Sequence, residues 1–370
     1  MIAFRKHWHL AGKAWDAMIK YQMYTNDTSY QKDIQSALSR NMEELPNHQG
    51  YRMARKAPEG GEKEIWWIYP ALTAMESRFP ALECKSWNAS VGSNGKCNTS
   101  WESLAINAFE EYALRWNKEN ETCSGGLRWQ LENPGYKNTV TNGGFFQIEA
   151  RLARYTGNST FAEWATRVWE WTVNVKLMDI TDEYHVYDGT DDRQGRNCSL
   201  DGYFETQEWS HTLGLYLHGA ANMYAYSQRK GEPTSHQNWG KHIEGLLGRA
   251  KHTFSSPYKN LTSTLIIYEK ICERKNDCNE DQMSYKGTLV QALGRAMILV
   301  PSMAPKIEKL LNATSVGASS GCSIKPEYNN ACSMKWNTGQ WDGETRFGAQ
   351  VSSLEAVLGV LVGSAPLVTI

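Results

Sequence analysis

The sequence predicts an all-α protein in which helices pack on helices. Six long stretches repeat apolar residues at spacings of three and four, and alternating strand patterns are scarce. Small residues stand among the apolar ones, which lets neighbouring helices approach closely. With shorter segments included, we expect about eleven helices. The six stretches are residues 11–24, 102–116, 144–155, 161–177, 210–227 and 284–300.

An internal repeat narrows the architecture. The segment MYTNDTSYQKDI, from Met23, resembles RYTGNSTFAEWA, from Arg154. Each segment ends one helix and begins another. In each segment a Thr at the expected helix start precedes Gln31 or Glu163 by three positions. This is the spacing of a capping box, in which side chains accept hydrogen bonds from the free backbone amides at a helix start. A repeated helix-turn-helix unit predicts an α/α array or toroid.

Loops are expected in four regions, and no low-complexity linker divides the chain. The four are residues 80–100, 123–144, 180–206 and 320–345. In a toroid of helices, long connections of this kind build the rim of a central cleft. We therefore expect residues 1–370 to form a single domain.

The charge balance and the aromatic content limit the class of partner. The formal net charge is −1, which argues against nucleic acid or an anionic membrane as partner. The 15 Trp and 18 Tyr, against 9 Phe, favour aromatics with a polar edge, which suit both sugar-binding surfaces and large cores. His7 and His9 alone make a weak metal motif, and no other cluster has metal-ligand spacing. We expect no metal and no cofactor.

Eight cysteines and eight N-glycosylation sequons indicate an oxidising, extracellular compartment. Proximity along the chain predicts three disulfides and leaves a fourth for the remaining pair. The expected pairs are Cys84–Cys97, Cys272–Cys278, Cys322–Cys332 and Cys123–Cys198. The sequons are at Asn26, Asn88, Asn98, Asn120, Asn158, Asn197, Asn260 and Asn312.

The two ends of the sequence carry no targeting segment of their own. MIAFRKHWHL has no apolar core of the kind that a signal peptide needs. VLGVLVGSAPLVTI is too short to span a membrane and lacks the polar spacer of a lipid-anchor signal. We expect a monomer that is secreted or held at the cell wall or outer plasma-membrane surface, with membrane attachment only through a lipid anchor absent from this sequence.

Four segments together resemble glycoside hydrolase family 76, with the greatest similarity to its fungal members. They are CSGGLRWQ (123–130), NGGFFQIEARLARYTGN (142–158), YDG (187–189) followed by NCS (197–199), and CSMKWNTGQWDG (332–343). The resemblance runs from about His9 to Leu361. It implies an (α/α)6 toroid of twelve helices and retaining action on α-1,6-mannan. It also implies a role in attaching glycoproteins to fungal cell-wall polysaccharide.

The resemblance also exposes two departures. Family members have a first helix before the segment corresponding to KHWHLAGKAW, whereas this sequence begins almost at that segment, so we expect a toroid lacking its first helix. Family members also carry two adjacent aspartates where PEGGEKEIWW stands here. The register puts Glu62 at the place of the nucleophile and Lys63 at the place of the acid/base.

The Glu-Lys-Glu triplet fits the family mechanism poorly. A retaining glycosidase needs two carboxylates ~5 Å apart, and a lysine replaces the second one only if its pKa is strongly depressed. Glu62 and Glu64 would point ~200° apart on a helix and so would not converge on one oxygen. Asp191 and Asp192 offer a second acidic pair, most simply explained as solvated turn residues.

Further candidates are weighed against structural roles. His211 is either an acid/base near neutral pH or a hydrogen-bonded wall residue. Five tryptophans lie in segments that line the family's cleft, where stacking on sugars and core filling are equally expected: Trp66, Trp67, Trp129, Trp209 and Trp341. Polar candidates for binding sugar hydroxyls, or for shaping turns and loops, are Asp188, Asp342 and Asn142.

Three functions stay open at this stage. The first is a glycosidase or transglycosylase acting on cell-wall mannan. The second is a glycan-binding relative that kept the aromatic cleft and lost the carboxylate pair. The third is an enzyme with shifted catalytic residues that acts on another polysaccharide. One example of its reaction would be β-elimination from a uronate.

Overall fold

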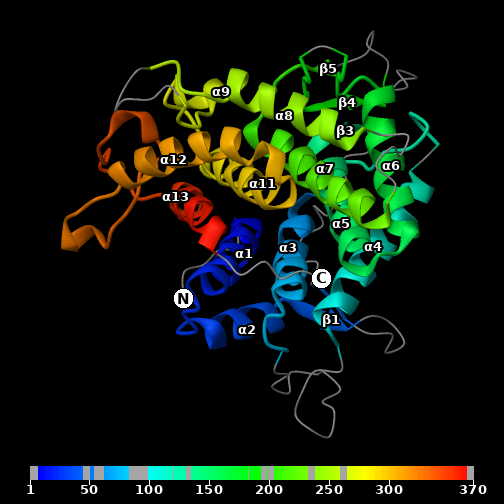
Figure 1. Ribbon diagram of the computed structural model, residues 1–370, viewed down its shortest axis with the longest axis horizontal. Coiled ribbons are helices and arrows are strands. Elements are labelled where there is room, and N and C mark those ends of the chain that lie inside the picture. Colours follow the sequence, from blue (N-terminus) through cyan, green and yellow to red (C-terminus); the bar gives the residue numbers. More distant parts are fainter. Residues whose placement is uncertain are drawn as a thin grey trace, which may run out of the picture.

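The computed structural model describes most of the chain and shows a ring of helices (Figure 1). The described residues are 7–44, 51–53, 62–82, 99–119, 121–130, 135–181, 183–192, 198, 204–231, 238–258 and 265–364.

The inner layer is a closed ring. Each inner helix packs against the next, and the last, α13, packs against the first, α1. This order places α5 on the opposite side of the ring from α13. The inner helices are α1 (Trp8–Thr25), α3 (Glu62–Ser77), α5 (Thr139–Thr156), α7 (Ser210–Lys230), α11 (Tyr285–Leu299) and α13 (Phe347–Leu361).

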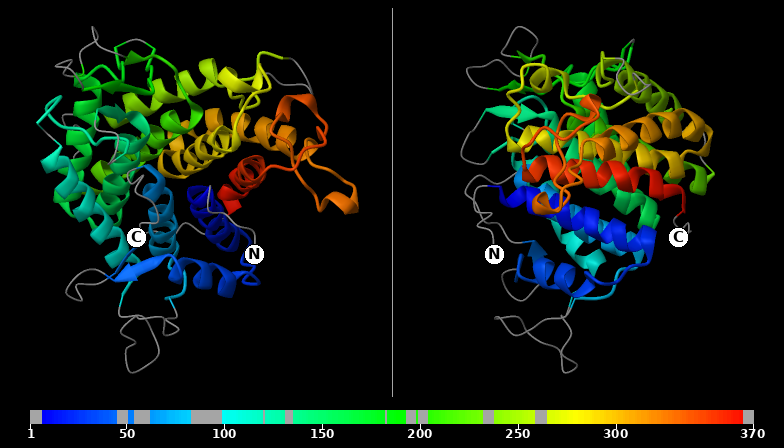
Figure 2. Two further views of the ribbon diagram at one scale, coloured as in Figure 1. Left: turned by 180° about the vertical axis from the view of Figure 1, so that it is seen from behind. Right: turned by 90° about the vertical axis from the view of Figure 1, so that its left-hand side faces the viewer.

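The outer helices lie toward the periphery, each against the inner helix that precedes it (Figures 1 and 2). They are α2 (Gln31–Ser39), α4 (Trp101–Lys118), α6 (Ser159–Asn174), α8 (Trp239–Thr253) and α12 (Ala304–Ser320). The predicted (α/α)6 toroid is therefore correct. Within the described ranges α13 has no outer helix after it, and Val357 and Val360 are exposed on its surface.

Short elements complete the described structure. Strands β1 (Met42–Glu44) and β2 (Tyr51–Met53) pair antiparallel, and β3 (Tyr136–Asn138), β4 (Gly189–Asp191) and β5 (Phe204–Glu205) form an antiparallel sheet in that order. Single-turn helices α9 (Lys270–Glu273) and α10 (Glu280–Met283) precede α11. The 3-10 turns are η3 (Pro301–Met303), η4 (Pro326–Tyr328), η5 (Trp336–Thr338) and η6 (Val362–Ser364).

Helix starts differ from the predicted ones where local side chains override periodicity. The helix expected from residue 144 begins at Thr139, because the Asn138 side chain accepts the amide of Thr141. The expected Thr caps are wrong. Tyr30 caps α2 without a side-chain bond, and Asn158 caps α6 by accepting the amide of Thr160.

Three of the four predicted disulfides are present. Cys123 bonds Cys198, Cys272 bonds Cys278, and Cys322 bonds Cys332. The prediction for Cys84 and Cys97 lies outside the described residues. The long-range bridge, Cys123–Cys198, ties the loop after α4 to the loop before α7.

No single helix in the described part of the chain is long and apolar enough to cross a membrane. One bent pair, Glu280–Leu299 with Pro301–Ser320, meets the length and composition criteria only when its two helices are joined, and it bends by 115°.

The closeness of the inner helices depends on small residues. A Cβ at Gly12 of α1 would overlap the carbonyl oxygen of Trp66 on α3. Glycine is therefore the residue that lets these two helices touch. The same contact fixes the position of α1 relative to α3 along the helix axes. It therefore also fixes the relative positions of the polar side chains on these two helices.

An ion-pair cluster is buried toward the carboxyl ends of the inner helices. The Glu76 carboxylate is paired with Arg151 through two nitrogens, each 3.0 Å away, with Arg154 at 3.0 Å and with Arg295 at 3.1 Å. Burial alone would raise the pKa of Glu76, but the three guanidinium groups lower it far below its ordinary value. We call these four residues the arginine cluster.

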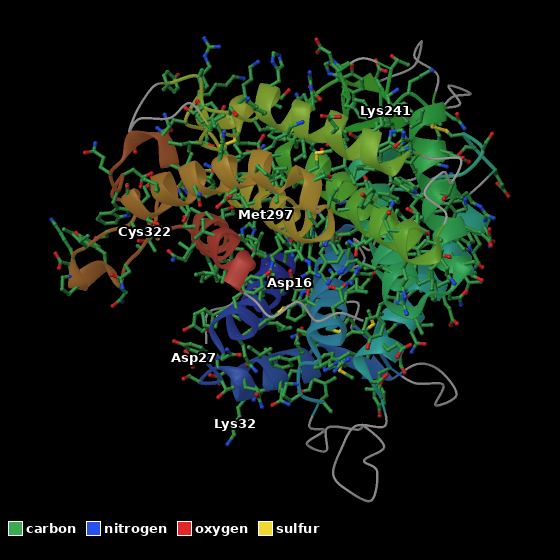
Figure 3. All side chains as sticks on the ribbon, viewed as in Figure 1. Asp16, Asp27, Lys32, Lys241, Met297 and Cys322 are labelled. Carbon is green, nitrogen blue, oxygen red and sulfur yellow. A yellow bond between two sulfur atoms is a disulfide. The ribbon has the colours of Figure 1, made fainter. Side chains whose placement is uncertain are left out.

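A second buried group lies one turn closer to the amino-terminal ends of the helices. The Lys20 ammonium pairs with Asp16 at 3.1 Å and with Glu355. Thr73 and Gln291 also bond the Asp16 carboxylate, and Asp16 lies toward the middle of the ring in Figure 3. The ring interior thus contains a column of buried polar groups that are paired with one another.

Candidate functional site

The candidate site is an axial pocket above this column, between α1, α3, α11 and α13. Its volume is about 10 Å³, the space of roughly one water molecule. A sugar ring needs more room, so it must bind above the pocket or displace a side chain from it. The lining residues are Lys13, Asp16, Trp66, Tyr69, Ser284, Gly287, Thr288, Gln291, Val351 and Glu355.

Lys13 fills the pocket. Its ammonium lies 3.8 Å from the centroid of the Trp66 ring, a cation–π contact. It also donates hydrogen bonds to Ser284 Oγ at 2.9 Å and to Thr288 Oγ1 at 3.4 Å. The ammonium occupies the space against Trp66, which is itself 2% exposed.

One wall of the site is a stacked pair of rings. The imidazole of His211, on the first turn of α7, lies 3.6 Å from the ring of Tyr285, with planes inclined by 26°. Burial, reinforced by the Lys13 ammonium, lowers the pKa of His211 well below its ordinary value. His211 is therefore neutral near pH 7. The stacking on Tyr285 favours a packing role, and the lowered pKa argues against an acid/base that titrates near neutrality.

A carboxylate with two imidazoles stands at the mouth of the pocket. Asp281 Oδ1 lies 2.9 Å from His9 Nε2 and 3.2 Å from His7 Nδ1. Burial would raise the pKa of Asp281, but the hydrogen bonds and charges of His9 and His7 lower it far below its ordinary value. Asp281 is thus a stable carboxylate, linked to the pocket through its neighbour Ser284.

The Glu62, Lys63 and Glu64 triplet forms the first turn of α3. Glu64 is 7% exposed, and Lys63 is half-buried; the side chain of Glu62 lies outside the described part of the structure. The backbone is a regular helix from Glu62 onward and not an irregular segment.

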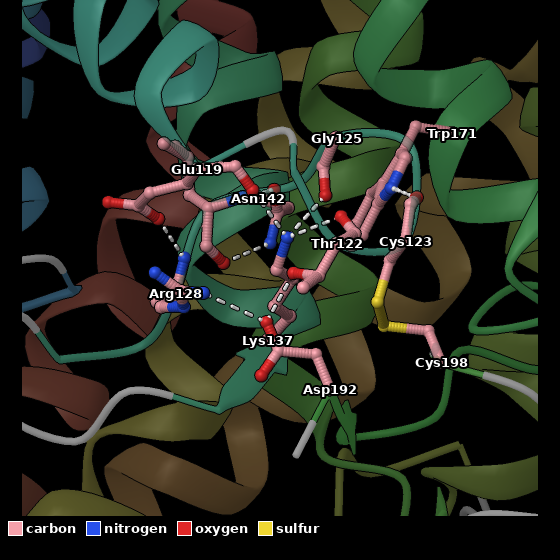
Figure 4. Close-up of a disulfide and its surroundings, with 11 residues drawn as sticks. Glu119, Thr122, Cys123, Gly125, Arg128, Lys137, Asn142, Trp171, Asp192 and Cys198 are labelled. Atoms are coloured by element: carbon pink, nitrogen blue, oxygen red, sulfur yellow. Dashed lines mark hydrogen bonds and ion pairs between the residues drawn. A yellow bond between two sulfur atoms is a disulfide. The ribbon is translucent and has the colours of Figure 1, made fainter. Parts of the chain in front are cut away.

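Asp191 and Asp192 are buried, at 2% and 7% exposure. Their interpretation as solvated turn residues is wrong, because Asp191 ends strand β4 and Asp192 lies beneath a loop. Asp192 Oδ2 accepts hydrogen bonds from Thr122 Oγ1 and, at 3.2 Å, from Arg128 (Figure 4). These bonds favour a structural role in holding the loop after α4.

A buried lysine anchors the same loop. Lys137 Nζ donates to the carbonyl oxygens of Glu119, Thr122 and Gly125, at 2.9, 3.0 and 2.6 Å (Figure 4). Burial lowers the pKa of Lys137 to about 8. Together with the Cys123 disulfide, these bonds fix the loop that carries Trp129.

Trp129 lies at the rim near the start of α5. Its backbone amide donates to Tyr136 at 2.8 Å, and the two rings meet edge to face, with centroids 5.9 Å apart. The Tyr136 hydroxyl donates to Asp188 Oδ2 at 2.6 Å. All three side chains are half-buried. We call Trp129, Tyr136 and Asp188 the α5 rim.

Three other candidates are integrated into the fold. Trp67 is 1% exposed, and its Nε1 donates to the Trp8 carbonyl at 3.0 Å. Asn142 exchanges hydrogen bonds with the Leu127 backbone in both directions, so it orients a loop and not a sugar hydroxyl. Trp209 is buried as the residue before α7 and packs edge to face on Tyr285. These positions favour core filling.

Trp341 and Asp342 lie on the far side of the ring from Trp129, in the segment before α13. Trp341 is half-buried and Asp342 is exposed, which leaves both within reach of a ligand. The Trp341 Nε1 donates to the Glu344 carbonyl at 3.0 Å, and Asp342 Oδ1 accepts the Glu344 amide at 3.0 Å.

Sequence reasoning missed Lys13, Asp281 and Tyr285. Lys13 follows His9 by four positions on α1, which is the spacing that puts both on one helix face, but nothing in the sequence shows that this face is the inner one. Within the described residues, no group of three or more His, Cys, Asp or Glu side chains is arranged to hold a metal ion.

Comparison with known proteins identifies the family. The model of glycosyl hydrolase family 76 matches residues 1–369. The chain belongs to this family. The family 76 chain is 33% identical to the mannan endo-1,6-alpha-mannosidase DCW1 of Candida albicans, over 99% of its own length and 75% of the relative. It is 32% identical to DCW1 of Saccharomyces cerevisiae, over 95% of its length and 71% of the relative.

Solved structures agree on the fold of the family 76 chain. Dfg5 from Chaetomium thermophilum, in complex with glucosamine, aligns with a TM-score of 0.79 and 26% identity, covering 97% of this chain and 82% of that one. An inactive α-1,6-mannanase variant from a Salegentibacter species, in complex with α-1,6-mannotriose, aligns with a TM-score of 0.68 and 16% identity, covering 96% and 89%. The latter similarity concerns the fold alone.

Proposed function

We propose that this protein acts on the α-1,6-linked mannan of the fungal cell wall, by hydrolysis or by transfer to another glycan. The observation that carries the proposal is the match over nearly the whole chain to proteins named mannan endo-1,6-alpha-mannosidase. We further propose that the chain is one domain, works as a monomer, and is secreted or held at the cell surface.

Glu62 is the proposed nucleophile. It begins α3, where the positive end of the helix dipole favours an ionised carboxylate. In a retaining mechanism this carboxylate attacks the anomeric carbon, while a second group protonates the departing oxygen and later deprotonates water. The neighbouring position is Lys63, so the identity of that second group decides whether the chain hydrolyses mannan.

Two ionisable groups near the mouth, Asp281 and His211, have pKa values that are lowered from their ordinary values. Asp281 is held ionised by His7 and His9, which suits it to stabilise positive charge on a sugar ring and makes it a poor proton donor. His211 is neutral near pH 7 and stacked on Tyr285, so it has no proton to give at that pH.

A second candidate function is mannan binding without hydrolysis. It is favoured by Lys63 at the place of the acid/base and by the Lys13 ammonium against Trp66. Such a protein would keep aromatic and polar contacts for the polysaccharide, and Trp129 and Asp188 at the α5 rim are the residues through which it would bind.

The release of reducing ends from α-1,6-mannan separates these functions. The native protein is compared with Glu62→Gln and with the double variant Glu62→Asp, Lys63→Asp. If the native protein releases ends and Glu62→Gln does not, the hydrolase is supported. If only the double variant is active, or if none is active while native protein is retained on a mannan column, the binding function is supported.

A third outcome concerns another substrate. A native protein that neither binds nor cleaves mannan, but cleaves a polyuronate with formation of an unsaturated product, would act by β-elimination. That result would overturn both mannan proposals. The absorbance of the unsaturated uronate distinguishes this product from hydrolytic reducing ends.

A further inference from the structure

The segment between α12 and α13, residues 321–346, exposes aromatic and apolar side chains that the axial pocket does not use. We call it the arm. It extends beyond the helices at the edge of the ring, coloured orange (Figures 1 and 2). Tyr328 is 42% exposed and Ile324 is 95% exposed. Exposed apolar groups gathered on one segment indicate a contact surface.

Two rings form the centre of this surface. The ring centroids of Tyr328 and Trp341 are 4.3 Å apart, with planes inclined by 46°. Asp342, exposed beside Trp341, adds a carboxylate that can accept hydrogen bonds from hydroxyl groups. Aromatic rings beside a hydrogen-bond acceptor match the chemistry of a pyranose, which has a C–H face and a rim of hydroxyls.

The arm is anchored at its base, so the rings are positioned before a ligand arrives. The Cys322–Cys332 disulfide closes it where it leaves α12 (Figure 3). The Cys332 amide donates to Gln350 Oε1 of α13 at 3.0 Å. Trp336 is fully buried, and its Nε1 donates to Ser353 Oγ at 3.2 Å. Such preorganisation lowers the entropy lost on binding.

The arm adjoins the mouth of the axial pocket. It leads directly into α13, whose Gly348 amide donates to Glu280 Oε2 at 3.2 Å. Glu280 is the residue before Asp281. Because α13 lies opposite α5 in the ring, the arm and the α5 rim stand on opposite sides of the mouth. A polysaccharide crossing the mouth from one side would reach the other.

We propose that Tyr328, Trp341 and Asp342 bind a stretch of polysaccharide outside the axial pocket, so that the protein prefers long mannan chains to short ones. This rests on the proposed action on mannan. The occupant is a glycan: its length lets it touch the arm while another part lies at the pocket, which raises the overall affinity through two linked contacts.

The test compares affinities for long α-1,6-mannan and for α-1,6-mannotriose. The double variant Tyr328→Ala, Trp341→Ala is expected to bind the long polymer about tenfold more weakly, given the energy of aromatic contacts. Its affinity for mannotriose should stay unchanged. Tyr258→Ala is the matched control, since Tyr258 is 44% exposed, packs edge to face on Tyr268, and lies outside the arm.

The outcomes separate this proposal from the function on which it rests. Equal retention of the native protein and the double variant on long mannan would overturn the arm proposal and leave mannan binding intact. No retention of the native protein on mannan would overturn both. If the double variant changes only the oligomeric state, the arm is a protein contact and the proposal fails. Asp342→Asn, which keeps the side-chain shape, should also weaken binding of long mannan, by a smaller factor than the double variant.

Discussion

The arginine cluster and the mouth of the axial pocket both gather charged side chains inside the ring, yet they differ in what satisfies each charge. In the arginine cluster, Glu76 is paired with three guanidinium groups, and all of these partners are charged. At the axial pocket, the contacts of Lys13 include two hydroxyls and the face of a ring, in addition to the charge of nearby Glu355.

This difference separates stability from binding. A buried carboxylate among three cations leaves a large uncompensated charge if it is removed, so the arginine cluster should dominate the free energy of unfolding. Hydroxyl groups and a ring face are contacts that a sugar can also offer or accept. The mouth is therefore the region where a ligand can replace protein contacts at little cost.

The largest expected effect is at Glu76. Glu76→Gln keeps the side-chain shape but leaves Arg151, Arg154 and Arg295 without their shared counter-charge. We expect the free energy of unfolding to fall by about 3–5 kcal/mol. Denaturant unfolding followed by circular dichroism measures it. A loss below about 1 kcal/mol would show that the arginine cluster does not dominate stability, since that is the range of exposed pairs.

The next effect is the pH dependence of stability through Glu355. Burial raises its pKa to about 7, from an ordinary value of 4.5. The folded protein therefore binds this proton more tightly, and the resulting stability is full below pH 4.5 and is lost as the pH rises through 7. Glu76 has a lowered pKa, so its contribution to stability has the opposite pH dependence. That contribution is lost as the pH falls into the acidic range.

Glu355→Gln tests that sign. The variant cannot lose the proton, so between pH 4.5 and 7 its unfolding free energy should fall less steeply than that of the native protein, by on the order of 2 kcal/mol. Urea unfolding at several pH values gives the slopes. Parallel curves for the two proteins would contradict the prediction. Glu269 is also buried, and its pKa is raised to about 8. Its titration leaves a residual pH dependence of the unfolding free energy in both the native protein and the variant.

A smaller effect is expected at Lys13. Lys13→Ala removes the ammonium from Trp66 and enlarges the axial pocket, so affinity for α-1,6-mannotriose should rise about tenfold. The stability cost should be about 1 kcal/mol, from the lost hydrogen bonds and cation–π contact. Isothermal titration calorimetry measures the affinity.

Lys13→Met is the matched control for pocket volume. Methionine keeps most of the side-chain length without the charge, so the pocket stays filled and the affinity should stay near the native value. If Lys13→Ala binds mannotriose more weakly than the native protein, Lys13 itself contacts the sugar. That result would contradict the idea that a ligand replaces the contacts of Lys13 in the axial pocket.

The smallest effect is expected for an exposed pair. Lys306 Nζ and Glu244 Oε1 lie 2.7 Å apart on the outer surface, with both side chains more than 60% exposed. Lys306→Ala should leave the melting temperature unchanged, because solvent screens such pairs. Differential scanning calorimetry checks this. A clear drop would show that burial is not what distinguishes the arginine cluster.

The sequence predicted the architecture because periodicity reports helices reliably. Apolar spacing located four of the inner helices, α1, α5, α7 and α11, and two outer ones, α4 and α6. Proximity gave the Cys272–Cys278 and Cys322–Cys332 disulfides, and Cys123–Cys198 followed as the remaining pair. Helix starts were missed where one polar side chain decides, as Asn138 does for α5. The inner helices of a toroid are buried on more than one side, as α5 and α7 are, so the sequence does not show which polar residue faces the axis.

The candidate site was only partly predictable for the same reason. Trp66 lines the axial pocket, whereas Trp67, one residue on, is turned into the core. Asp191 and Asp192 were read as solvated because adjacent aspartates favour turns, whereas the pairing of β3 with β4 buries them. Lys13 and Asp281 lie near the same pocket only because the amino-terminal half of α1 packs beside the segment that joins α10 to α11.

The closure of α13 on α1 has a consequence for biosynthesis. Chains are made from the amino terminus, and domains begin to fold as they emerge. Asp16 and Lys20 are made early, but their partner Glu355 belongs to the last helix of the ring. Until α13 is made, the inner faces of α1 lack their neighbour, so the ring can close only near the end of synthesis, and partly made chains would depend on chaperones.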